Sequence, residues 1–231
     1  LACHLIQFRG EQNENPEKVF GEVAEAGWDG VEGMKTDSAE ELVELAGLAR
    51  RLGLHMINVG GPDPIAKVKY NITLGNDTAE VPSLRRAEWG GDDPSDADVE
   101  QAARSLDDVL AFCKEHHVKG FHHAHLRTLI ETVEDAERLM GAAPDLWLLY
   151  DTGHFLAAGS DPMQVFERDV LKHRIGHVHL KDTHANDPAG WNHRTGTFND
   201  EARFAELGTG NLGLDVKAVM ENLGAVGYDG W

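Results

Sequence analysis

The sequence has few cysteines, few basic residues and no long apolar run, and each shortage excludes a class of protein. It contains 2 cysteines, 21 basic and 40 acidic residues, for a net charge of −19. Cys3 and Cys113 match no disulfide framework, thiolate metal site or redox spacing. The acidic excess opposes binding to nucleic acid, because neutralising phosphates needs clustered Lys and Arg. Without about 18 consecutive apolar residues or a charged-then-apolar leader, we expect neither a membrane span nor a signal peptide, and hence a cytoplasmic protein.

Short apolar runs alternate with helical periods along the chain, which is the pattern of βα units around a parallel sheet. Seven strands are expected, at residues 1–8, 30–34, 54–61, 78–84, 119–125, 146–151 and 175–182. Helices are expected between them, at residues 16–27, 38–53, 65–76, 95–118, 133–142, 161–172 and 214–227. Ser38 and Ser95 are suited to cap their helices, and a long Gly-, Asn- and Asp-rich loop should follow the seventh strand.

Two similar segments of the sequence favour a closed barrel over an open sheet. "AEAGWDGVEG" near the start and "GAVGYDGW" at the finish share the same turn, and the first copy leads into a strand. An eighth strand would therefore begin at Trp231. We expect an α/β protein with a (β/α)₈ TIM barrel in a single domain over residues 1–231, strand 8 being missing from this chain. An open doubly wound sheet is the alternative, but no Gly-rich phosphate fingerprint follows the first strand.

Polar side chains stand at the carboxyl ends of most of the predicted strands. The active site of a (β/α)₈ barrel lies at these ends. The residues concerned are Glu32, His122, His123, His125, Glu131, Asp151, His154, His177, His179 and Lys181. In the stretch "RIGHVHLKD", strand geometry places His177, His179 and Lys181 on one face. Such a buried row of ionisable groups is costly unless it is paired or binds a metal. We therefore expect a divalent cation, with Asp151 and Glu131 as anionic ligands; mixed oxygen and nitrogen donors suit Mn²⁺, Co²⁺, Mg²⁺ or Zn²⁺.

Each of these residues also has a simpler interpretation. A histidine at a strand end is often only hydrogen-bonded within the structure. Asp151 is suited to cap the turn that follows it, and Glu131 to interact with the dipole of the next helix. Glu32 would then be an interior structural carboxylate, and Lys181 would pair with Asp182 or another acid. The coincidence of many polar strand ends is what favours a common site.

The chain resembles the xylose isomerase-like barrels, and among them the inosose dehydratases most. The resemblance is carried by "FHHAHLRTLIETVEDAERLM", "LLYDTGHFLAAGSDP", "RIGHVHLKD" and "FAELGTGNLGLDVKAVMENLGAVGYDGW". It implies a divalent metal held by a carboxylate after strand five, the Asp of the sixth-strand motif, a His of the seventh strand and a Glu on strand eight. In this sequence these positions are Glu131, Asp151 and His179, and the strand-eight Glu has no counterpart.

The resemblance further implies a lyase that removes a proton beside a ketone and then expels water. The metal would bind the carbonyl and adjacent hydroxyl oxygens and stabilise the enediolate. Lys181 or Glu32 would be the base, and His154 or a strand-five histidine would protonate the departing hydroxyl. His123, His125 and His177 are the candidates for contacts with a sugar or cyclitol substrate.

Other functions remain open at this point. A keto-sugar epimerase or isomerase would use the same metal site and return the proton instead of losing water. A non-catalytic sugar-binding barrel would bind its ligand without turnover. Repair of abasic DNA occurs among such barrels, and the acidic charge argues against it. An exposed edge where strand 8 would lie favours association into a homo-oligomer.

Overall fold

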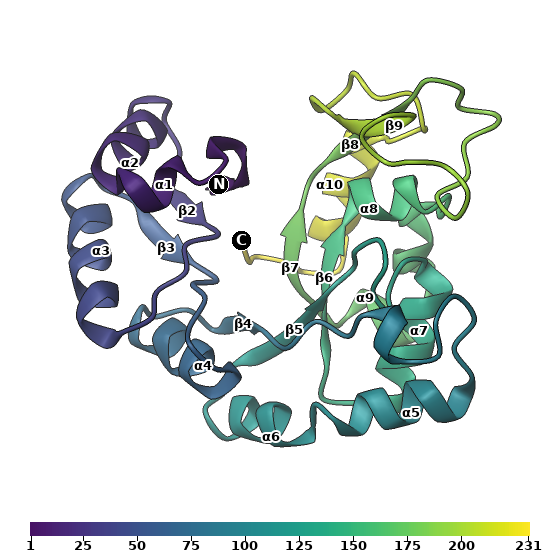
Figure 1. The fold of residues 1–231 in the computed structure, drawn as a ribbon, viewed down its shortest axis with the longest axis horizontal. Coiled ribbons are helices and arrows are strands. Elements are labelled where there is room, and N and C mark those ends of the chain that lie inside the picture. Colours follow the sequence, from purple (N-terminus) through teal and green to yellow (C-terminus); the bar gives the residue numbers. More distant parts are fainter. The chain divides into compact units, whose positions relative to one another are not determined.

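The computed structural model describes residues 1–231 as two compact units (Figure 1). The first unit comprises Leu1–Val81, Ala111–Gly120 and Trp231, and the second comprises Pro82–Leu110 and Phe121–Gly230. The chain passes from one to the other after Val81, within α6 (Asp107–Glu115), within β5 (Lys119–His123) and after Gly230. None of the helices combines the length and the apolar character that a membrane crossing requires.

The first unit contains a parallel sheet in the order β1, β2 and β3. The strands of this sheet are β1 (Ala2–His4), β2 (Gly30–Glu32) and β3 (His55–Ile57), and β4 (Thr78–Glu80) belongs to another sheet, in the order β4, β5, β6 and β7. The helices of the first unit are η1 (Leu5–Phe8), α1 (Glu11–Glu14), α2 (Pro16–Glu25), α3 (Ala39–Arg51) and α4 (Pro64–Thr73). The predicted Ser38 cap is confirmed, because its hydroxyl accepts the backbone N–H of Glu41. The apolar faces of α2 and α3 join the strands in one core that includes Val19, Phe20 and Leu42.

The second unit pairs β5, β6 (Trp147–Asp151) and β7 (Ile175–His179) in parallel. Its remaining elements are η2 (Arg86–Glu88), α5 (Asp96–Arg104), α7 (Val133–Ala142), α8 (Thr152–Ala157), η3 (Pro162–Glu167), α9 (Asp169–Lys172), β8 (Asp182–Ala185), β9 (Ala202–Ala205) and α10 (Val216–Ala225). Fully buried Phe121, Leu148, Tyr150 and Phe155 pack in its interior. The alternation of strand and helix predicted from the sequence is thus confirmed in both units.

Two helices that the sequence predicts as continuous are each divided in the structure. The expected helix over residues 95–118 becomes α5 and α6, which are separated by Ser105 and Leu106, and the hydroxyl of Ser105 donates to the Ala102 carbonyl at 2.6 Å. The predicted helix over residues 161–172 becomes η3 and α9, and Arg168 between them is extended. The Ser95 cap is confirmed as a capping box with Asp98.

The segments after β6 and β7 also differ from the prediction. α8 follows β6 directly, where the sequence indicated only a polar motif. The predicted long loop after β7 contains an antiparallel hairpin in which β8 pairs with β9. The strand predicted over residues 1–8 ends at His4, and η1 follows it. Residues 226–231 after α10 contain only turn and irregular structure.

Candidate functional site

The ends of β5, β6 and β7 bring five polar side chains of the second unit together. The strand register places Asp151 opposite His179, and because all three strands are parallel their carboxyl ends lie at one edge of the sheet. We call the group His123, Asp151, His154, His179 and Lys181 the Asp151 cluster. It joins residues that the sequence analysis selected from three separate strand ends.

A single oxygen of Asp151 is the centre of this cluster. Its Oδ2 lies 2.7 Å from Lys181 Nζ, 3.0 Å from His123 Nε2 and 3.3 Å from His179 Nδ1. The Asp151 side chain is fully buried. The predicted convergence of Asp151 and His179 is therefore present.

The other oxygen of Asp151, Oδ1, caps the helix that follows β6. Oδ1 accepts the backbone N–H of His154 at 3.0 Å, so that Asp151 is the N-cap of α8. The capping interpretation is thus confirmed for Oδ1, and Oδ2 is the oxygen that faces the cluster. Because the cap fixes the carboxylate plane, Oδ2 points in a defined direction, and α8 carries His154 into the cluster on its first turn.

The other histidines surround the cluster. The ring of His123 meets those of His154 and His179 edge-on, with centroids 5.5 Å and 4.9 Å apart. The exposed His125 lies 3.8 Å from the ring of His154. His177 stacks on Phe121 at 5.2 Å and lies 5.3 Å from His179. The three histidines predicted to contact substrate are therefore next to the cluster.

Burial and charge set the protonation states within the cluster. Burial acts to raise the pKa of Asp151, but the Lys181 ammonium and the hydrogen bonds from His123 and His179 outweigh it and hold that pKa well below its ordinary value. Burial lowers the pKa of His154 to about 2, although Asp151 opposes this. Burial also lowers the pKa of His123. At neutral pH the cluster therefore pairs an ionised carboxylate with neutral imidazoles at positions 123 and 154.

Both the backbone and the amine of Lys181 are held by hydrogen bonds or ion pairs. Its backbone N–H donates to the hydroxyl of Thr152 at 2.9 Å, and the same hydroxyl donates to its carbonyl at 2.6 Å. Its amine pairs with Asp151, whereas the carboxylate of Asp182 accepts the backbone N–H groups of Gly208 and Gly210. The alternative pairing of Lys181 with Asp182 is therefore wrong, and the pairing with another acid is the one observed.

Glu131 lies in a different environment from the one that the sequence suggested. Its Oε2 is 2.9 Å from Arg86 Nε and 3.1 Å from Arg194 Nη2, and its Oε1 accepts the Arg127 N–H at 2.6 Å. Arg86 also pairs with Asp135. Burial acts to raise the pKa of Glu131, but the nearby His193, the Arg127 N–H and the two guanidinium charges bring it below its ordinary value. The structure thus surrounds Glu131 with cations and does not group it with Asp151 and His179.

Glu32, which the sequence analysis proposed as a base alongside Lys181, belongs to the first unit. It ends β2, is 4% exposed, and its Oε1 accepts the side-chain N–H of Asn58 at 3.0 Å. A role for Glu32 in proton transfer stays a prediction.

The donor atoms of His123, Asp151 and His154 all lie within 4.8 Å of one another. One carboxylate oxygen with two neutral imidazoles is a donor set that divalent transition metals accept. His179 adds a third imidazole on the same oxygen. The residues present therefore fit a divalent cation, with His123 and His154 in place of the predicted Glu131.

Three contributors were not selected from the sequence. Thr152 fixes the backbone of Lys181, Arg86 neutralises Glu131, and Phe204 of β9 packs against Lys181 and His154. The "DTGH" motif contains Thr152, so its position offered a signal. No sequence spacing links Arg86 or Phe204 to the strand ends, because both come from the connecting segments.

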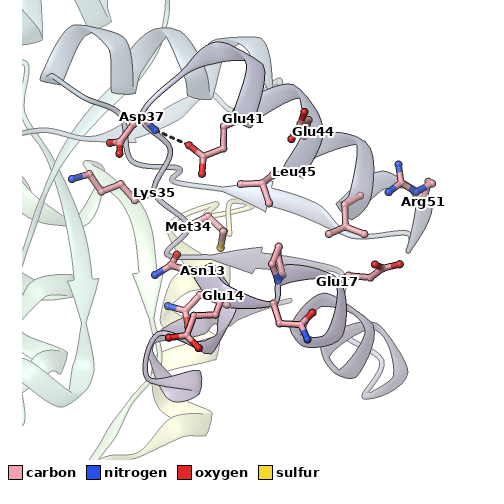
Figure 2. Close-up of a pocket in the computed structure, with 14 residues that line it drawn as sticks. Asn13, Glu14, Glu17, Met34, Lys35, Asp37, Glu41, Glu44, Leu45 and Arg51 are labelled. Carbon is pink, nitrogen blue, oxygen red and sulfur yellow. Dashed lines mark hydrogen bonds between the residues drawn. The ribbon is translucent and has the colours of Figure 1, made fainter.

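The first unit has a groove of its own, with a volume of about 680 Å³, and Figure 2 shows the residues that line it. Glu14 and Glu17 come from α1 and α2, and Glu41 and Glu44 come from α3. Glu41 accepts the backbone N–H of Asp37 at 2.9 Å. No residue that the sequence analysis selected as a site residue lines this groove.

Comparison with family models matches residues 20–231 to the xylose isomerase-like TIM barrel. The chain belongs to this family. The predicted (β/α)₈ TIM-barrel class is thereby confirmed, and the parallel strands of both units fit it.

Two curated relatives are named for rhizopine catabolism and for inosose dehydration. The rhizopine catabolism protein MocC of Rhizobium meliloti is 33% identical over 154 residues, which is 65% of this chain and 43% of that protein. The inosose dehydratase of Clostridium tetani is 30% identical over 155 residues, or 66% of this chain and 48% of the relative. The chain thus spans about half the length of the curated relatives it matches.

Among solved structures, the IOLI protein with a bound zinc atom is similar in fold. It superposes with a TM-score of 0.69 at 16% sequence identity, over 99% of this chain and 85% of that one. At this identity the likeness concerns the fold alone.

Proposed function

We propose that this chain takes part in the dehydration of an inosose or a related polyhydroxy ketone with the help of a divalent cation. The observation that carries the proposal is the Asp151 cluster, in which two imidazoles and a lysine amine meet at one oxygen of a buried carboxylate. Two relatives named for inosose dehydration and rhizopine catabolism support the substrate class. The zinc in the IOLI structure supports a cation in this fold.

His123, Asp151 and His154 would hold the cation, with His179 beside them. Such an ion polarises a ketone oxygen and thereby acidifies the neighbouring C–H bond. Because the pKa of His154 is about 2, its imidazole stays neutral and suits a ligand better than a proton donor.

Lys181 is the proposed base. Its amine lies at the edge of the cluster with the side chain 25% exposed, so that a ligand can approach it. Once the ammonium form that pairs with Asp151 has lost its own proton, the amine takes the proton from the carbon beside the ketone. Thr152 fixes the backbone of Lys181, which keeps the amine at one place relative to Asp151.

His125 is the proposed proton donor for the departing hydroxyl. It is exposed, and its ring lies 3.8 Å from that of His154. The proton that it gives converts the leaving hydroxyl to water, and His177, which lies 5.3 Å from the ring of His179, would contact a hydroxyl group of the substrate.

The test is product analysis after incubation of the purified chain with an inosose and one cation at a time, with a chelator as the blank. A product lighter by one water supports the dehydratase. A product of unchanged mass and altered stereochemistry would identify an epimerase, and binding without turnover a sugar-binding barrel. Lys181→Met should abolish turnover, whereas Lys172→Met on α9, which changes an amine outside the cluster, should leave it intact.

A further inference from the structure

Phe204 is a large apolar side chain in an unusual place. It lies on β9 opposite Thr183 of β8 and is 37% exposed. Its ring lies 5.1 Å from Lys181 Nζ and meets the ring of His154 edge-on, with centroids 4.9 Å apart. Phe204 therefore contacts two members of the Asp151 cluster from a hairpin that contributes no member of its own.

We infer that Phe204 is a positioning residue, which fixes the Lys181 amine on Asp151 and limits rotation of the His154 ring. This inference rests on the proposed function. An aromatic face attracts an ammonium group at such distances, and it covers the side chain at the same time.

The surroundings of Lys181 explain why a ring is needed there. Thr152 holds the backbone of Lys181, and the Thr183 hydroxyl donates to the Gly153 carbonyl at 2.9 Å, so that β8 is tied to α8. The lysine side chain has four flexible carbons between this anchor and Asp151. Phe204 is the aromatic group against that flexible part.

The packing around Gly153 shows how closely these groups meet. A Cβ atom at Gly153 would lie 2.5 Å from the Cβ of Lys181 and 3.0 Å from the ring of Phe204. Since real contacts of this kind are not so short, any side chain at position 153 would displace one of them. The absence of a side chain at Gly153 thus allows Lys181 and Phe204 to pack against the start of α8.

Phe204 packs against Phe198, which in turn packs against Trp191. The ring of Phe198 lies 4.9 Å from that of Phe204, and Trp191 lies 6.3 Å from Phe198. Trp191 Nε1–H donates to the Ala157 carbonyl of α8 at 2.8 Å. This row of rings connects the hairpin loop to the helix that carries His154, so the position of Phe204 is fixed relative to the cluster.

The experiment compares Phe204→Leu, which keeps apolar volume without the ring, with Phe204→Tyr, which keeps the ring. Phe204→Leu should lower kcat about three- to tenfold with KM changed less than about twofold, because an ammonium–ring contact contributes modestly and the ion pair remains. Phe204→Tyr should keep the kcat of the wild type, because it keeps the ring. Arg203→Ala, an exposed neighbour on the same strand, is the matched control and should behave as wild type.

A second measurement does not depend on turnover. Acetylation of Lys181 by an amine-reactive ester, followed by peptide mass spectrometry, reports how freely the amine leaves Asp151. Phe204→Leu should accelerate labelling of Lys181 relative to Lys172 in the same sample, and Phe204→Tyr should not. Circular dichroism confirms that each variant is folded.

The outcomes separate the inference from the proposed function. Faster labelling in Phe204→Leu, when wild type shows no turnover, supports the positioning role and refutes the proposed reaction. Normal turnover in wild type, with labelling unchanged in Phe204→Leu, overturns the positioning role and leaves the reaction in place. A change confined to KM also overturns it, since it would make Phe204 a substrate contact.

Discussion

Asp151 and Glu131 are two buried carboxylates with opposite surroundings. Both follow strands of the second unit, both are at most 4% exposed, and both have a pKa below the ordinary value. Glu131 is paired with guanidinium groups, which stay charged and neutralise its carboxylate. Asp151 is surrounded mainly by imidazoles, which have lone pairs of their own to offer a cation. The neighbours of a carboxylate, and not its burial, distinguish a ligand from a structural ion pair.

The largest effect should come from Asp151→Ala. Loss of the central oxygen separates His123, His179 and Lys181, so both bound metal and turnover should disappear. Metal analysis of the dialysed protein and product analysis check the two losses. A variant that remains active and metal-loaded would refute the assignment of the site. The matched change Glu131→Gln should retain the metal.

Glu131→Gln should instead reduce stability. It leaves the buried Arg86 with a neutral amide beside its Nε and only Asp135 as an anionic partner, which should cost about 2 kcal/mol in the free energy of unfolding. Denaturant unfolding monitored by circular dichroism measures this change. Glu134→Gln on α7 is the control, because Glu134 pairs with Arg168 at the surface and should cost less than about 1 kcal/mol. Equal losses in the two variants would contradict the distinction.

The buried imidazole of His154 and the buried carboxylates of Asp151 and Glu131 should respond to acid in different pH ranges. His154 has a pKa of about 2 when folded and 6.5 ordinarily, so between these values the unfolded chain binds a proton that the folded chain does not. Stability should therefore fall as pH decreases below about 6.5, by up to about 1.4 kcal/mol per pH unit. Glu131 and Asp151, with lowered carboxyl pKa values, should lose stability only below about pH 4.5.

Denaturant unfolding of the chelator-treated protein between about pH 7 and about pH 5 checks the imidazole part of this prediction. His154→Gln should flatten the decline in that range, and His173→Gln, which changes an exposed histidine on no strand, should not. Parallel declines in wild type and His154→Gln would show that the cluster does not exclude protons as described.

The smallest effect should come from Arg194→Ala. Arg194 is 36% exposed and shares Glu131 with the buried Arg86. Its loss should cost about 0.5–1 kcal/mol in the free energy of unfolding, because Arg86 still neutralises the carboxylate. Raising the salt concentration should reduce the difference from wild type. A loss as large as that of Glu131→Gln would mean that Arg194 is the main partner.

Much of the fold could be predicted because local signals agree with it. The helix predicted over residues 133–142 has the observed bounds of α7, where Thr132 caps it through a box with Asp135. The hairpin of β8 and β9 could not be predicted, since its pairing depends on contacts between segments far apart in a polar loop. The break between α5 and α6 at Ser105 and Leu106 could not be predicted either, because the apolar spacing of residues 95–118 continues across it.

The candidate site could be predicted in part for a similar reason. Strand ends converge in a parallel sheet whatever their side chains, so Asp151, His179 and Lys181 could be grouped from sequence. Glu131 lies after the strand, and its surroundings depend on Arg86 and Arg194 from distant segments. No rule of spacing connects these three residues, and only the folded chain shows that they meet.

The shared use of the Asp151 carboxylate couples the cluster to the backbone. Because Oδ1 accepts the amide of His154, opening of the first turn of α8 releases the carboxylate plane and moves an imidazole of the cluster in the same event. The exchange of that one amide hydrogen with solvent is thus a direct reporter of whether the cluster is assembled, whatever small molecule is present.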